Sequence, residues 1–317
     1  VGAGDFTGLD QIPTLGGLAA VAARYLPEID HRLSLTLPVK EKEWLEELRR
    51  RIMAGDRAAE ARIAFMHQLV QRAGDLAQME YGFLFDASRR LLAIGYNVGE
   101  RKLDASCYDL LASEARFACF VGIAQGQLPE ESWFALGRLL TTTGGEPILL
   151  SWSGSMFEYL MPLLVMPAYD GTLLYQTCKA AVVSQIDYGK KRSVPWGISE
   201  CGYNAIDVHH NYQYRAFGVP GLGLKRGLAE DLVIAPYASA LALLIAPEKA
   251  CLNLQRLDAE GFSGRYGLYE AIDYTPARMP SGQVRTVVRS FMAHHQGMSF
   301  LALASLLLGK RMQQRFE

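Results

Sequence analysis

The chain alternates helical segments with long connectors, and this alternation constrains its fold most strongly. Apolar residues recur at helical spacing through most of the 317 residues, whereas runs typical of strands are short. Three connectors, 142–155, 192–228 and 261–283, are rich in Gly, Pro and Tyr and exceed the few residues that usually join two helices. Connectors this long tend to carry function. We therefore expect an all-α dominated fold, a ring of paired helices with long connecting loops gathered at one end.

Start and stop signals place the individual elements. Pro247 suits the first turn of a helix, and Gly261 lies just past the end of that helix. A short β-hairpin is expected near residues 83–96, around a polar turn. Residues 1–39, interrupted by three prolines, are interpreted as an N-terminal linker or cap before a main domain of residues 40–317. The predicted helices are 41–54, 57–78, 108–126, 130–140, 157–164, 172–189, 229–245, 247–260 and 294–308.

Composition argues against several classes of function. The formal net charge of −1 provides no basic surface for nucleic acid. The longest apolar runs, 238–247 and 300–308, are shorter than the ~20 residues that a membrane span requires, so we expect no membrane insertion by this segment. Five cysteines without a CxxC pair indicate free thiols in a reducing compartment. The chain does not begin with Met and is expected to be a fragment of a larger multidomain protein.

Glu200 is the leading candidate for a catalytic residue. It lies in the stretch WGISECGYN (196–204), among small residues and between Trp196 and Tyr203. Aromatic rings cover the apolar faces of a sugar, amides and hydroxyls bind its rim, and carboxylates transfer protons or attack carbon. Because no helix face or cap accounts for Glu200, this pattern predicts a carbohydrate-active enzyme.

Three other glutamates interrupt apolar or aromatic surroundings. Glu114 is predicted on the buried stripe of a helix, where burial would raise its pKa as a general acid requires; an ion pair with Arg116 is the alternative. Glu158 has capping-box spacing from Ser155, which would explain it structurally. Glu270 lies among tyrosines and suits either a sugar subsite or a salt bridge.

Two pairs of adjacent histidines, His209-His210 and His294-His295, raise the possibility of a metal site. Neighbouring side chains diverge on a helix or a strand, so a shared ion would need ligands from elsewhere. We therefore expect hydrogen bonding or structural roles for these histidines, and no metal. The glycine-rich stretch 221–227 departs from the spacing of a nucleotide-binding loop and is interpreted as a turn.

Six stretches together resemble one known family, the glucoamylase-like middle domain of bacterial cyclic β-1,2-glucan synthases. The similarity runs from about residue 80 to the C-terminus. It implies an (α/α)6 barrel related to endo-β-1,2-glucanases, and no cofactor. The matching stretches are YDLLASEARFA (108–118), SWSGSMFEYLMP (151–162), WGISECGYN (196–204), NYQYRAFGVPGLGLKRGL (211–228), YGLYEAIDYTP (266–276) and MAHHQGMS (292–299).

The resemblance also implies an activity. It predicts a retaining transglycosylase that closes linear β-1,2-glucan into rings through a covalent glycosyl-enzyme, with Glu114 as acid/base and Glu200 as nucleophile. Partners would be glycosyltransferase and phosphorylase-like domains of the same parent chain, at the cytoplasmic face of the bacterial inner membrane. An endo-β-1,2-glucanase and a non-catalytic glucan-binding module remain open alternatives. Candidate substrate-binding residues in and beside these stretches are Asp109, Trp152, Glu158, Trp196, Tyr203, Asn204, His209, Tyr212, Tyr214, Tyr269, Glu270, Asp273, Tyr274, His294, His295 and Gln296.

Overall fold

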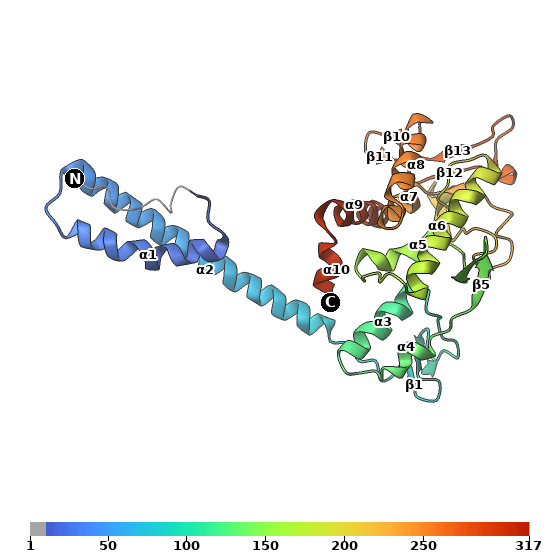
Figure 1. Ribbon diagram of the computed structural model, residues 1–317, viewed down its shortest axis with the longest axis horizontal. Coiled ribbons are helices and arrows are strands. Elements are labelled where there is room, and N and C mark those ends of the chain that lie inside the picture. The colour runs from blue at the N-terminus through green and yellow to red at the C-terminus, as the bar shows by residue number, and fades with distance from the viewer. Residues whose placement is uncertain (1–10, 317) are drawn as a thin grey trace. The chain divides into compact units, whose positions relative to one another are not determined.

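The structure, a computed structural model, describes residues 11–316 and forms two compact units that divide between Glu80 and Tyr81. Figure 1 shows both units in the colours of the sequence. The first unit consists of helices α1 (Leu15–Leu33) and α2 (Val39–Ala77), which pack against each other. Ile29 of α1 and Leu45 of α2 are fully buried in their shared core.

One continuous helix, α2, replaces the two helices predicted at 41–54 and 57–78. Gly55 lies at the predicted break, but a glycine inside a helix costs only about 1 kcal/mol. A Cβ at Gly55 would lie 3.5 Å from Cδ1 of Leu18 of α1, an ordinary packing distance, so nothing at this position interrupts the helix. Residues 40–80 thus share a compact unit with the residues before them. The assignment of residues 40–317 as the catalytic domain stays a prediction.

Helices dominate the second unit, as the sequence predicts, and the ring of helix pairs stays a prediction. The predicted helices at 172–189, 247–260 and 294–308 are confirmed as α6, α8 and α9. The helices of this unit are α3 (Ser113–Ala124), α4 (Glu131–Ala135), α5 (Met156–Leu160), α6 (Leu173–Arg192), α7 (Pro236–Leu241), α8 (Pro247–Ala259), α9 (Ala293–Leu308) and α10 (Arg311–Phe316), with 3-10 turns η2 (Met161–Leu164), η3 (Ala242–Leu244) and η4 (Pro276–Arg278).

The short hairpin predicted near residues 83–96 is confirmed as β1 with β2, and further short antiparallel strands form where the sequence predicted none. These segments satisfy their own backbone hydrogen bonds by pairing locally. The hairpin pairs are β1 (Phe85–Asp86) with β2 (Leu91–Leu92), β3 (Tyr96–Asn97) with β4 (Lys102–Leu103), β5 (Leu140–Thr143) with β6 (Glu146–Leu149), β7 (Cys201–Ile206) with β8 (Tyr212–Arg215), and β10 (Ser263–Gly264) with β11 (Gly267–Leu268). A three-stranded sheet has the order β13 (Thr286–Val288), β12 (Ala271–Asp273), β9 (Val233–Ile234).

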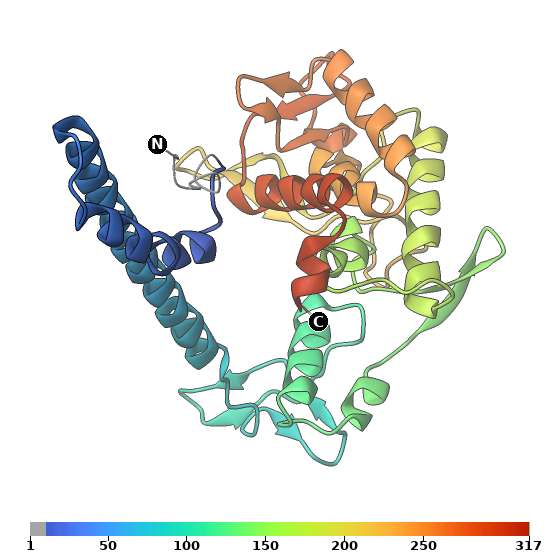
Figure 2. The ribbon, with the colours of Figure 1, turned by 60° about the vertical axis from the view of Figure 1, so that its left-hand side comes forward.

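The core of the second unit centres on α5, α6 and α7. All residues of α7 are buried, and it packs against α5, α8 and α9. Tyr159 of α5 is fully buried, and its hydroxyl donates to the carbonyl oxygen of Leu222 over 2.7 Å. Figure 2 shows α9 in red below the orange and red strands of residues 263–288. Among residues 11–316, no helix combines the length and apolar character needed to cross a bilayer.

Candidate active site

Glu200 ends a loop that α6 and α5 hold in place. Gln185 of α6 forms two hydrogen bonds with the backbone of Ile198, of 2.8 and 2.7 Å. The hydroxyl of Ser199 accepts from the backbone N–H of Phe157 over 3.0 Å. Glu200 follows directly and leads into β7. Because the two residues before it are hydrogen-bonded to α6 and α5, the backbone at Glu200 is held in a fixed position, as catalysis requires.

The surroundings of Glu200 adjust its proton affinity in two directions. Burial is the main cause of a pKa above the ordinary 4.5, and the negative charges of Glu158 and Glu114 raise it further. The hydroxyl of Tyr214 donates to Oε1 of Glu200 over 3.2 Å, and this bond and the nearby His295 oppose the rise in the pKa. Glu158 and Glu114 therefore both lie within electrostatic range of Glu200.

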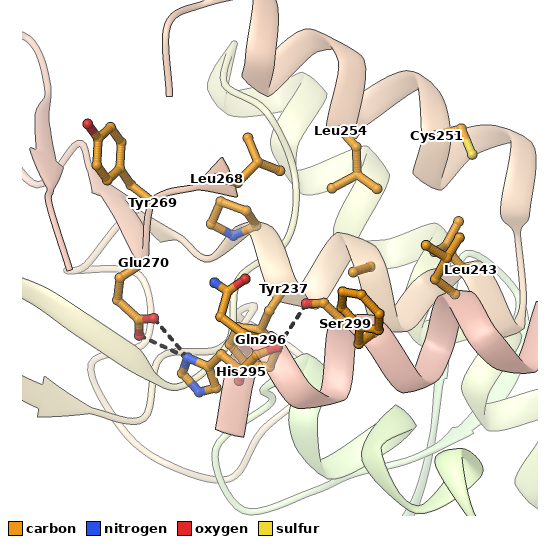
Figure 3. Close-up of a pocket in the computed structure, with 14 residues that line it drawn as sticks. Tyr237, Leu243, Cys251, Leu254, Leu268, Tyr269, Glu270, His295, Gln296 and Ser299 are labelled. Carbon is orange, nitrogen blue, oxygen red and sulfur yellow. Dashed lines mark hydrogen bonds and ion pairs between the residues drawn. The ribbon is translucent and has the colours of Figure 1, made fainter. Parts of the chain in front are cut away.

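A buried histidine lies behind Tyr214. Nε2 of His295 is 3.2 Å from the Tyr214 hydroxyl, and its Nδ1 is 2.9 Å from Oε1 of Glu270. His295 and Glu270 are 1% and 2% exposed. The ring of Tyr237 stacks on His295 at 3.7 Å with an interplanar angle of 11°. Figure 3 shows the two contacts between Glu270 and His295 as dashed lines. Glu270 is thus a structural partner of a histidine, the salt-bridge alternative predicted from the sequence.

A pocket of ≈ 270 Å³ opens beside this pair. Glu270 and His295 form its polar end with Gln296, and the rest of its lining is mostly apolar (Figure 3). Tyr269, predicted to bind a sugar, also lines it. The pocket brings together four of the residues selected from the sequence, although their contact with a substrate stays a prediction.

Glu114 does not occupy the buried stripe that the sequence predicts. The predicted helix 108–126 begins only at Ser113, because Asp109 accepts hydrogen bonds from the backbone of Leu111 and Ala112 and holds a turn there. Glu114 therefore falls in the first helical turn, where its side chain is exposed and the helix dipole favours a carboxylate. Burial raises the pKa of Asp109 instead.

The predicted ion pair between Glu114 and Arg116 is also wrong in the described part of the chain. Arg116 is buried, and its Nε donates to the carbonyl oxygen of Leu110 over 2.9 Å. Glu114 accepts from the hydroxyl of Ser113 over 3.0 Å. Its carboxylate thus faces solvent and is accessible to a ligand, which suits proton transfer to a bound sugar.

Glu158 performs the capping role that its spacing predicts. Its carboxylate completes a capping box with Ser155 at the start of α5. It also accepts from the hydroxyl of Ser151 over 2.9 Å and from the backbone N–H of Ser153 over 3.1 Å. These bonds shape the loop that carries Trp152, which is 65% exposed. Trp152 therefore remains a platform on which a sugar could stack.

Asn204 and Asp273 link the β7–β8 hairpin to the three-stranded sheet. Asp273, which is fully buried, accepts from the backbone N–H of Asn204 over 3.1 Å and pairs with Nε of Arg278 at 2.7 Å. The guanidinium of Arg278 lies 5.0 Å from the centre of the Tyr203 ring. The predicted substrate-binding residues Tyr203, Asn204 and Asp273 therefore have structural partners that position the hairpin.

The remaining predicted residues are scattered. Trp196 is buried in the core, so we do not expect its ring to contact a sugar. His209 is exposed in the turn of the β7–β8 hairpin, whereas Tyr212 and Tyr274 are half-buried. Burial lowers the pKa of His294. No group of three or more His, Cys, Asp or Glu side chains is placed to hold a metal ion in residues 11–316.

Sequence reasoning missed Tyr237, whose hydroxyl donates to the backbone oxygen of Glu200 over 2.9 Å and lies 2.8 Å from the hydroxyl of Ser199. Its apolar helical surroundings predict only a core residue. The available signal was the pair Tyr237 and Ser239, polar groups inside an otherwise apolar segment that must find buried partners.

Comparison with known proteins confirms the resemblance of the sequence motifs. The chain is 51% identical over 249 residues to the cyclic beta-(1,2)-glucan synthase NdvB of Rhizobium meliloti (strain 1021). This match covers 78% of the chain and 9% of the synthase, so the chain spans about a tenth of the length of that relative.

Two solved structures share the fold. The "putative glucoamylase" of Bacteroides caccae ATCC 43185 matches with a TM-score of 0.53 and 14% identity, over 95% of this chain and 66% of that one. A variant of the endo-beta-1,2-glucanase of Talaromyces funiculosus, in complex with beta-1,2-glucan, matches with a TM-score of 0.51 and 14% identity, over 96% and 62%. A family model described as "Putative glucoamylase" matches residues 107–316, which include Glu114 and Glu200. The chain belongs to this glucoamylase-like family.

Proposed function

We propose that this chain is a retaining transglycosylase that acts on linear β-1,2-glucan and closes it into rings. The observation that carries the proposal is the setting of Glu200, a half-buried carboxylate on a rigid loop that accepts a hydrogen bond from Tyr214 and lies within electrostatic range of Glu114. The identity with a cyclic β-1,2-glucan synthase supports the choice of substrate. The likeness to solved glucoamylase and endoglucanase structures supports an (α/α)6 barrel as the complete fold.

Glu200 would act as the nucleophile. Its carboxylate attacks the anomeric carbon of a β-1,2-linked glucose and forms a covalent glycosyl ester, while the glycosidic bond breaks. Glu114 protonates the leaving oxygen, directly or through a relay, and then accepts a proton from the incoming hydroxyl. The exposed position of Glu114 at the start of α3 supports this second role, because the acid/base must exchange protons with the substrate.

Ring closure requires that the far end of the same glucan attacks the glycosyl ester before water does. Acceptor subsites must therefore hold a sugar hydroxyl at high effective concentration and exclude water. Trp152 and Tyr214, which expose 65% and 42% of their surface, are the aromatic residues best placed to contribute to such subsites. In the parent protein, glycosyltransferase and phosphorylase-like domains at the cytoplasmic face of the inner membrane would act on the same glucan.

A second candidate function is plain hydrolysis by an endo-β-1,2-glucanase, which the likeness to the Talaromyces enzyme favours. The two reactions differ in the acceptor alone. A third candidate is a glucan-binding module without turnover, and it is the least favoured because Glu200 has a perturbed pKa in a polar site.

Mass spectrometry of the products distinguishes these candidates. The chain is incubated with linear β-1,2-glucan, with the Glu200→Gln variant as the control. Products lighter than the linear glucan of the same length by one water, seen only with the unmodified chain, would support ring closure. Shorter linear fragments without any ring product would indicate a hydrolase, because ring closure also releases a linear leaving fragment, and binding without turnover would indicate the module.

A further inference from the structure

Four side chains form one hydrogen-bonded chain from the candidate nucleophile into the core. Oε1 of Glu200 lies 3.2 Å from the Tyr214 hydroxyl, which lies 3.2 Å from Nε2 of His295. Nδ1 of His295 lies 3.0 Å from Oε2 and 2.9 Å from Oε1 of Glu270. The Glu200 carboxylate and the His295 imidazole bond to the same hydroxyl, so their protons must be counted together.

The backbone determines the protonation at the buried end. Gly202 donates its N–H to Oε1 of Glu270 over 3.1 Å, so this carboxylate accepts at that oxygen. An ionised Glu270 that accepts from this backbone N–H can only accept from His295 as well, so Nδ1 carries a proton and donates a hydrogen bond to Glu270. Nε2 of His295 then either carries a second proton and donates a hydrogen bond to Tyr214, or carries none and accepts a hydrogen bond from Tyr214. The Tyr214 hydroxyl has a single proton, which it cannot donate to both of its neighbours.

We propose that Glu200 and His295 share one proton through the Tyr214 hydroxyl, and that Glu270 holds this proton on His295. His295 is then doubly protonated, Tyr214 accepts from Nε2 and donates to Glu200, and Glu200 is ionised. Tyr214, His295 and Glu270 are positioning residues for Glu200.

The second form of the chain has the same number of protons. The Nε2–H bond of His295 breaks and its proton passes to the Tyr214 oxygen, while the O–H bond of Tyr214 breaks and that proton passes to Oε1 of Glu200. His295 is then neutral and Glu200 is a carboxylic acid. The same three residues are bonded in both forms, so Glu200 can change its charge without exchanging a proton with solvent.

Burial decides which form is favoured. Glu270 is 2% exposed, and His295 is its ion-pair partner in the described part of the chain. Leaving a buried carboxylate without a counter-charge is strongly unfavourable, so Glu270 stabilises the doubly protonated imidazole beside it. Glu200 is closer to solvent than Glu270, so its ionised form loses less hydration.

Most of the other titratable groups that face the chain do not compete for this proton. Burial raises the pKa values of Tyr214, Tyr237 and Cys201, so these groups stay protonated near neutral pH. Burial, and next the charge on His295, lowers the pKa of His294, whose ring lies 4.0 Å away, so the adjacent histidine does not compete for the proton. The carboxylates Glu158 and Glu114 act in the opposite direction, because their charges favour the protonated form of Glu200, whereas the charge on His295 and the hydrogen bond from Tyr214 favour the ionised form.

The test of the proton position does not depend on turnover. The imidazole nitrogens are labelled with ¹⁵N, and NMR spectra are recorded without substrate at about pH 7, with the His295 signals assigned by their loss in His295→Gln. We expect both nitrogens of His295 to be protonated in the unmodified chain, and Nε2 to lose its proton in Glu270→Gln. A singly protonated His295 in the unmodified chain would overturn the proposal, even if Glu270→Gln fails to fold.

The consequence for turnover rests on the proposed role of Glu200. Tyr214→Phe removes a hydrogen bond to a carboxylate, so we expect the acidic limb of the kcat/KM profile to move to higher pH by about one to two units. Tyr188→Phe is the control, because its hydroxyl contacts Arg192 on α6, outside the site. An acidic limb that stays in place in Tyr214→Phe would contradict the proposal. If the unmodified chain shows no turnover, the proposed function fails, and the NMR experiment still decides the proton position.

Discussion

The backbone N–H of Gly202 donates to Oε1 of Glu270 over 3.1 Å, although 68 residues separate them. This bond joins the segment that carries Glu200 to the carboxylate that pairs with His295. A Cβ at Gly202 would lie 3.3 Å from Cγ of Glu270, so the side chain of Glu270 packs tightly against this glycine. The candidate nucleophile and the buried ion pair are therefore one structural unit.

Replacing Glu200 by Gln should abolish turnover of linear β-1,2-glucan, with a loss in kcat of at least about 10³-fold, because an amide cannot form the glycosyl ester. Product formation over time is the measurement. Glu131→Gln removes an exposed carboxylate from α4 and should retain full activity. Equal activity of the two variants would exclude Glu200 as the nucleophile.

Glu200→Gln should also change the stability in a pH-dependent way. The pKa of Glu200 is raised in the folded state, so the folded chain binds more protons than the unfolded chain once the pH exceeds the ordinary value of 4.5. The free energy of unfolding contributed by Glu200 therefore falls as the pH rises through the window between these two pKa values. Urea denaturation should show Glu200→Gln gaining stability relative to the unmodified chain between about pH 4 and about pH 7. If the free energies of unfolding of the two proteins differ by the same amount at both pH values, the raised pKa of Glu200 would be contradicted.

Glu114→Gln should lower kcat by about 10²–10⁴-fold with little effect on folding, because its carboxylate is exposed and acts as a proton donor. A substrate whose leaving group needs no proton should restore much of the rate of the first step. Comparing natural glucan with an activated sophorosyl glycoside measures this difference. An equal loss with both substrates would argue against the acid/base role.

Arg278→Ala should destabilise the second unit by about 3–5 kcal/mol, because it leaves the buried carboxylate of Asp273 unpaired. The matched control is Arg285→Ala, which breaks a partly exposed pair with Glu260 and should cost about 1 kcal/mol or less. Chemical denaturation of both variants tests the contrast. Similar losses would mean that the pair between Arg278 and Asp273 does not maintain the hairpin.

Trp152→Ala should raise the KM for linear β-1,2-glucan about tenfold while the melting temperature stays unchanged, because a ring that is 65% exposed contributes more to stacking on a sugar than to the core. The KM of Trp152→Phe should fall between that of the unmodified chain and that of Trp152→Ala. Tyr266→Ala, which removes another exposed ring, is the control and should leave the KM unchanged. A KM unaffected by Trp152→Ala would remove Trp152 from the proposed subsites.

The sequence predicted the helix-rich fold and several of its elements correctly. The regular apolar spacing of α6, α8 and α9 identifies each helix, because one face of each is buried. Apart from the hairpin of β1 and β2, the strands were missed, since strands of two to six residues form from local turns and long-range packing rather than from a periodic pattern. The sequence predicted a helix from residue 108, but a hydrogen-bonded turn at Asp109 delays the start of α3 to Ser113.

The site was predicted in part. The isolation of Glu200 from any helix face and the capping box at Glu158 were readable from spacing alone. The connection from Glu200 through Tyr214 to His295 and Glu270 was not, because these residues come from four separate segments that only the tertiary fold brings together. Sequence reasoning placed three of these residues at the substrate without detecting that two of them are buried behind it.

Trapping the glycosyl-enzyme tests the central claim most directly. The Glu114→Gln variant is mixed with an activated sophorosyl glycoside, quenched in acid, digested and analysed by mass spectrometry. We predict a sophorosyl addition on the peptide that carries Glu200, because the first step proceeds without acid assistance and the second is slowed. An adduct on another carboxylate, or release of a product with inverted anomeric configuration and no adduct, would contradict the retaining mechanism through Glu200.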